Sequence, residues 1–107
     1  MREYYYLTAT ELIELIKSRK TSVEEVIMSH FQRIDALEDK IGAWAFLDKD
    51  HAIKNAVDID KKLAEGNFQG RLYGIPVGVN DVFNTYDMPT AMGSPQWQGF
   101  TPGNDAR

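Results

Sequence analysis

Cysteine is absent from this 107-residue chain, and acidic residues outnumber basic ones. Without cysteine there is no disulfide framework, no thiolate metal site and no cysteine nucleophile, and the composition fits a cytoplasmic protein. Twelve lysines and arginines against sixteen acidic residues give a net charge of −4, so the sequence has no basic stripe for nucleic acid. No apolar run approaches the roughly 18 residues of a membrane helix. We therefore expect neither a nucleic-acid nor a membrane partner.

The remaining composition is that of a globular protein. Hydrophobic residues make up 43% of the chain and charged residues 26%, a balance that supports a modest apolar core. The length fits one domain or part of one. We expect residues 1–107 to be part of a single domain.

Three stretches have the apolar period and the end signals of helices, and they span residues 7–18, 22–37 and 48–65. Thr8 and Ser22 are each followed three residues later by glutamate, the spacing of a capping box. Asp48 or Asp50 caps the third stretch, and Gly66 follows its end. The first two stretches predict a helical hairpin in residues 1–40.

Two short apolar segments, residues 43–47 and 72–79, are predicted to be strands. The second shows no polar alternation, as expected for a strand covered on both faces, and Pro76 suits a strand edge or start. Together with the third helix they predict a strand–helix–strand unit over residues 43–81 and an α/β fold with a mixed, incomplete sheet. Residues 82–107 have no period and predict a long loop, with a helix start at Asn104 or Asp105.

A polar pair, Asn80 and Asp81, follows the second predicted strand. Ligands bind at the carboxyl ends of strands in open α/β sheets, so this pair is the candidate site. Asp81 either orients a catalytic group or accepts hydrogen bonds from nearby backbone N–H groups, and the second interpretation is favoured. For Asn80 we likewise favour a residue that hydrogen-bonds the neighbouring backbone.

Other candidate residues favour structural interpretations. His30 lies near the apolar stripe of the second helix, His51 lies in the first turn of the third, and the two show no metal-ligand spacing. Ser94 follows a glycine in the long loop and is not predicted to be a nucleophile. The aromatic run Tyr4–Tyr6 is predicted to pack on its own domain or a partner rather than to stack on a ligand. We expect no metal and no cofactor.

Several segments, in order along the whole chain, resemble the amidase signature family. They include Leu7-Thr8-Ala9-Thr10-Glu11-Leu12, Gly70-Arg71-Leu72-Tyr73-Gly74-Ile75-Pro76 and Pro89-Thr90-Ala91-Met92-Gly93-Ser94. The resemblance implies amide hydrolysis by a Ser–cis-Ser–Lys triad, in which the lysine acts as the base. It places Asn80 at the catalytic lysine position. Because an amide nitrogen has no available lone pair, Asn80 is predicted to be non-functional there.

The resemblance also implies that the chain ends at Arg107 ahead of the segment that carries the two serines. The chain is therefore expected to be an amino-terminal fragment or truncated relative of an amide hydrolase, a pseudoenzyme inactive by itself. Two alternatives stay open: a non-catalytic binding or regulatory module, and an amidotransferase-type subunit. The open sheet edge predicts a second chain or copy as a partner, in an oligomer, and a small amide is a substrate only if the fold is completed.

Overall fold

The computed structural model describes residues 3–67 and 70–107. The predicted hairpin in residues 1–40 and the predicted single domain over residues 1–107 include residues 1–2 or 68–69, and these parts of the predictions lie outside the described residues. The chain divides into two compact units. The helical unit comprises residues 1–43 and 48–76, and the loop unit comprises residues 44–47 and 77–107. The elements are the 3-10 helices η1 (Tyr4–Tyr6) and η2 (Pro95–Trp97) and the helices α1 (Ala9–Lys17), α2 (Val23–Ile41) and α3 (Lys49–Ala64).

The predicted amino-terminal caps of all three α-helices are confirmed. The Thr8 hydroxyl accepts from the Glu11 amide at 3.2 Å and the Ser22 hydroxyl from the Glu25 amide at 3.1 Å. For α3 the cap is Asp48 rather than Asp50, because its carboxylate accepts from the amide three residues on at 3.1 Å. Each cap satisfies a backbone N–H that the helix leaves unpaired.

The carboxyl end of α2 lies beyond the predicted end at Leu37. The helix continues to Ile41 and ends at Gly42, whose φ of 60° is left-handed. The polar residues after Leu37 weaken the apolar period but are good helix formers, so the helix continues until a glycine ends it. Gly66, with φ of 84°, follows α3 as predicted.

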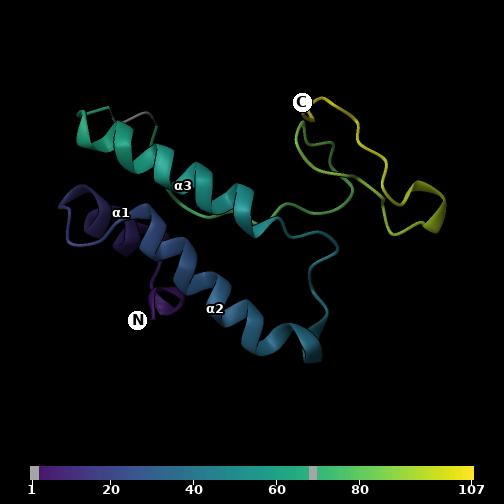
Figure 1. Cartoon of the computed structure of the whole chain (residues 1–107), viewed down its shortest axis with the longest axis horizontal. Helices are drawn as coiled ribbons and strands as arrows, with labels where there is room; N and C mark the ends of the chain where they lie inside the picture. The colour runs from purple at the N-terminus through teal and green to yellow at the C-terminus, as the bar shows by residue number, and fades with distance from the viewer. Residues whose placement is uncertain (1–2, 68–69) are drawn as a thin grey trace. The chain divides into compact units, whose positions relative to one another are not determined.

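The core of the helical unit lies between its helices. Figure 1 shows α2 beside α3, and α2 packs principally on α3 and on η1. The buried apolar residues of this core are Tyr4, Leu12, Ile16, Val23, Val26, Ala56 and Leu63. Tyr4 is only 4% exposed, and its amide donates to the Ser29 hydroxyl at 2.9 Å. The predicted packing of the aromatic run on its own domain is confirmed for Tyr4, whereas Tyr6 is exposed.

Polar contacts fix the register of the helices. Both carboxylate oxygens of Asp60 on α3 accept from the first turn of α2, from the Val23 amide at 2.8 Å and the Glu24 amide at 3.0 Å. The Arg19 guanidinium donates to the Leu63 carbonyl near the end of α3 at 2.7 Å. Asp60 thus supplies negative charge to the positive end of α2, and Arg19 supplies positive charge to the negative end of α3.

The predicted α/β fold is wrong. Among residues 3–67 and 70–107 the structure has helices but no strand and no sheet. Neither residues 43–47 nor residues 72–79 have a neighbouring strand, and the Ile75 amide instead donates to the Leu72 carbonyl in a turn at 3.0 Å. Apolar composition indicates only that a segment favours burial, whereas a strand also needs a hydrogen-bonded neighbouring strand.

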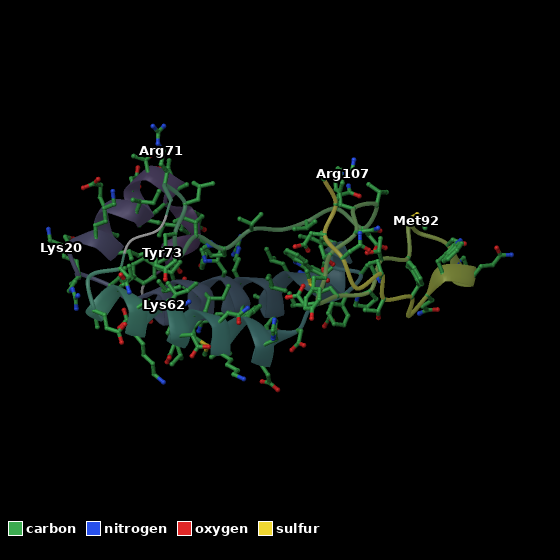
Figure 2. The ribbon with its side chains drawn as sticks, turned by 90° about the horizontal axis from the view of Figure 1, so that it is seen from above. Lys20, Lys62, Arg71, Tyr73, Met92 and Arg107 are labelled. Carbon is green, nitrogen blue, oxygen red and sulfur yellow. The ribbon has the colours of Figure 1, made fainter. Side chains whose placement is uncertain are left out.

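One buried polar atom in the helical unit lacks a partner. The Tyr73 ring packs against the core, and its hydroxyl is buried with no hydrogen-bond partner among the described residues. Figure 2 shows the Tyr73 side chain among those of the helices. Because an unpaired buried hydroxyl costs about 1–3 kcal/mol, Tyr73→Phe is expected to leave stability unchanged or raise it by about 1 kcal/mol.

Urea denaturation of the purified chain, followed by the helical circular dichroism signal, measures this change. Tyr73→Ala is the control, because it removes the ring as well and is expected to destabilise by about 3–5 kcal/mol. A clear loss of stability in Tyr73→Phe would show that the hydroxyl is paired in solution.

Candidate functional site

The candidate site lies in the loop unit, which is irregular but held together by hydrogen bonds. Apart from η2 it has no regular element. The predicted helix start near the end of the chain is not formed. Instead the Asp105 carboxylate accepts from the Tyr86 amide at 2.8 Å, and the Ala106 amide donates to the Asn84 carbonyl at 2.9 Å.

Asn80 forms a local turn. Its side-chain oxygen accepts from the Val82 amide at 3.2 Å, and its carbonyl accepts from the Phe83 amide at 3.1 Å. The residue is exposed. This Asx-type turn is the backbone role that the sequence favoured, and it is a role that many asparagines have in loops.

Asp81 joins two parts of the loop unit. Its carboxylate accepts from the Ala91 amide at 2.9 Å, and its carbonyl accepts from the Met92 amide at 3.0 Å. The carboxylate therefore satisfies a backbone N–H group, as favoured from the sequence, although the group lies ten residues away rather than nearby. Asp81 and Asn80 are adjacent in the chain, but their side chains accept from different segments.

Thr90 holds the loop unit together, although no pattern in the sequence predicts this role. It is 1% exposed, and its hydroxyl donates to the Phe83 carbonyl at 3.1 Å. Its amide donates to the Phe100 carbonyl at 2.8 Å. The signal that could have indicated it is its place after Pro89, in a segment that resembles the family. Thr90 thus connects the turn that begins at Asn80 with the segment around Phe100.

The loop unit contains no basic side chain that titrates near neutral pH. Residues 44–47 and 77–107 include no lysine and no histidine, and Arg107 is their one basic residue. Ser94 is their one serine, and it stands at the amino-terminal end of η2. A serine hydroxyl needs a base to become a nucleophile. The loop unit by itself therefore has a hydroxyl but no amine or imidazole to activate it.

The serines of the helical unit have backbone roles. Ser22 caps α2, the Ser29 hydroxyl accepts from Tyr4, and the Ser18 hydroxyl donates to the Leu15 carbonyl at 3.3 Å. The ring of His30 is within 2.8 Å of the Val26 carbonyl, and the ring of His51 contacts the Asn55 amide at 3.3 Å. In the described parts of the chain, no three histidine or acidic residues form a group that could hold a metal ion.

Comparisons with known proteins agree with the resemblance seen in the sequence. A family model described as Amidase matches residues 25–107. A glutamyl-tRNA(Gln) amidotransferase subunit of Acidothermus cellulolyticus is 40% identical over 99 residues, which are 92% of this chain and 20% of that protein. A putative amidase, AmiD, of Mycobacterium bovis is 36% identical over 100 residues, which are 94% of this chain and 21% of that protein. The chain thus spans about a fifth of the length of these relatives.

A solved structure matches as well. It is described as "An unexpected vestigial protein complex reveals the evolutionary origins of an s-triazine catabolic enzyme". One of its chains superposes with a TM-score of 0.84 at 28% identity, over 92% of this chain and 22% of that chain. Within the described residues, no helix is both long enough and apolar enough to cross a membrane.

Proposed function

The chain belongs to the amidase signature family, and on that premise we propose that it is the amino-terminal part of an amide-hydrolysing protein and has no hydrolase activity by itself. The observation that carries this proposal is the chemistry of the loop unit. Asn80 stands where the family resemblance implies the catalytic lysine, and no lysine or histidine lies elsewhere in that unit. A small amide becomes a substrate only when the rest of the domain is present.

The proposed inactivity follows from the chemistry of an amide side chain. An amide oxygen is a very weak base, and the amide nitrogen has no lone pair for a proton. The oxygen of Asn80 also accepts a backbone hydrogen bond from Val82. By contrast, a buried lysine can be neutral at working pH and accept the proton of a serine through a bridging hydroxyl.

The purified 107-residue chain is expected to hydrolyse a small aryl amide no faster than buffer does. Release of the aryl amine, followed by absorbance over hours at high protein concentration, measures this rate. Ser94→Ala is the matched variant, since Ser94 is the one serine in the loop unit. Turnover by the unaltered chain that Ser94→Ala abolishes would overturn the proposal and identify Ser94 as a nucleophile.

A second candidate is a component of an amidotransferase. The amidotransferase relative from Acidothermus cellulolyticus is more similar to this chain than the putative amidase is, at 40% against 36% identity. The net charge of −4 gives this chain no general attraction for a polyanion, so a nucleic acid would be bound by another chain. Transfer of ammonia to a glutamyl acceptor, measured with partner subunits present, distinguishes this candidate from simple hydrolysis.

A further inference from the structure

The loop unit has no apolar core of its own. The buried apolar residues described in the chain belong to the helical unit, whereas the buried residue described in the loop unit is the polar Thr90. Burial of apolar side chains is the main favourable term in folding. The loop unit therefore gains little stability from its own packing.

Its large apolar side chains are exposed instead. In the helical unit the exposed large apolar side chains are Tyr6, Ile41 and Leu72. In the loop unit they are Trp44, Phe46, Val77, Val79, Val82, Phe83, Tyr86, Met92, Trp97 and Phe100. Monomeric proteins seldom leave so many large apolar side chains exposed on one small unit, and such a surface marks an interaction site.

This surface is ordered without a partner. Thr90, Asp81 and Asp105 join distant parts of the loop unit by hydrogen bonds, and the ring of Trp97 meets that of Phe100 edge-on at 5.2 Å. The ring of Trp44 approaches Gly78 so closely that a Cβ there would lie 3.1 Å from Trp44 Cη2. Binding to a preformed surface costs less conformational entropy than binding to a disordered tail.

The lengths of the relatives indicate what covers the surface. The Acidothermus cellulolyticus relative aligns with this chain over 20% of its length, so about four-fifths of that protein has no counterpart in these 107 residues. A second copy of the chain is the alternative occupant, and self-association of the chain tests it. The part of the relative that has no counterpart in these residues is the occupant that the comparison favours.

We propose that the exposed apolar side chains of the loop unit are a docking surface for the polypeptide that corresponds to the remaining four-fifths of an amidase relative, in the same chain or in another. The inference names a partner and rests on the proposed function. It concerns binding only, so it does not depend on whether residue 80 can act as a base.

Co-expression tests the docking surface. The 107-residue chain carries an affinity tag, and the probe is the Acidothermus cellulolyticus relative without the 99 residues that align with this chain. The chain is expected to increase the soluble yield of the probe several-fold and to retain it on the affinity resin. Val79→Asp combined with Phe83→Asp places charges on the surface and is expected to reduce retention at least tenfold.

The matched control is Tyr6→Asp combined with Ile41→Asp. These side chains are 69% and 63% exposed in the helical unit, and their replacement is expected to leave retention unchanged. An unchanged helical circular dichroism signal shows that the helical unit is folded in both double variants, and an unchanged near-ultraviolet signal from Trp44 and Trp97 shows the same for the loop unit. The proposal would be overturned if the unaltered chain did not increase the soluble yield of the probe, or if the two double variants retained the probe equally well.

It would also be overturned if the chain associated with itself and the combined Val79→Asp and Phe83→Asp changes abolished that association, because the partner would then be a second copy of the chain. Retention on the resin is measured without turnover, so a failure of docking is distinguishable from a failure of catalysis.

Discussion

Asn80→Lys is expected to raise the rate of amide hydrolysis by about 10²–10⁴-fold in a completed protein, the range that a positioned general base contributes. The completed protein is a fusion of these 107 residues to the remaining four-fifths of the Acidothermus cellulolyticus relative. Asn80 lacks a basic atom, whereas a buried lysine supplies an amine that can lose its charge and accept a proton. Release of the amine product from a small aryl amide, compared between the Asn80 and Asn80→Lys fusions, measures the gain.

Two further measurements separate a base from a change of shape. Methionine has a side chain comparable in length to that of lysine but no basic nitrogen. The hydrolysis rate of the Asn80→Met fusion is therefore expected to match that of the Asn80 fusion. In the Asn80→Lys fusion the rate is expected to rise with pH as the amine deprotonates, because only the neutral amine accepts a proton. An Asn80 fusion as fast as Asn80→Lys would mean that position 80 is not the position of the base, and the proposed cause of inactivity would be wrong.

The helix starts could be predicted because their signals are local. Each cap residue and the amide that it bonds are three residues apart, so the sequence alone contains both partners. The end of α2 was missed because the prediction followed the apolar period, which fades after Leu37, rather than the glycine at 42. Local hydrogen-bonding chemistry was thus more reliable than apolar periodicity at the ends of helices.

The strand prediction failed because a strand depends on a distant neighbour. Residues 72–79 have the apolar composition of a buried strand, but no other part of the described chain pairs with them. The helix start near Asp105 failed for a related reason. The carboxylate that suits a helix cap accepts instead from the Tyr86 amide, 19 residues away in the sequence.

The position of the candidate site stays a prediction from the sequence, whereas its internal contacts could not be predicted. Asn80 and Asp81 could be located by resemblance, and the turn at Asn80 follows from an asparagine at the start of an irregular loop. The role of Thr90 depends on the carbonyls of Phe83 and Phe100, seven and ten residues away, in a loop without any period. No spacing rule relates those positions, so only the folded chain shows that Thr90 connects them.

Gly74→Ala is expected to destabilise the helical unit by about 2–5 kcal/mol. Gly74 has a φ of 86°, and a Cβ there would lie 2.7 Å from Val23 Cγ2. A left-handed conformation costs a residue with a side chain about 1–2 kcal/mol, and overpacking a core costs about 1–3 kcal/mol. Val23 cannot easily move, because it is β-branched, buried in the first turn of α2 and tied by its amide to Asp60. A drop in melting temperature of at least about 8 °C follows, since about 4–8 °C is lost per kcal/mol in a unit of this size.

Gly66→Ala is the matched control, because its φ is 84° and a Cβ there would meet nothing within 4 Å. It carries the backbone strain without the contact, so about 1–2 kcal/mol is expected, and the difference between the two variants measures the clash. Combining Gly74→Ala with Val23→Ala removes the clashing methyl, so the double variant is expected to lose less stability than the sum of the two single variants. Equal losses for Gly74→Ala and Gly66→Ala would mean that Val23 moves aside at no cost, and the close approach of residue 74 to α2 would then not require glycine.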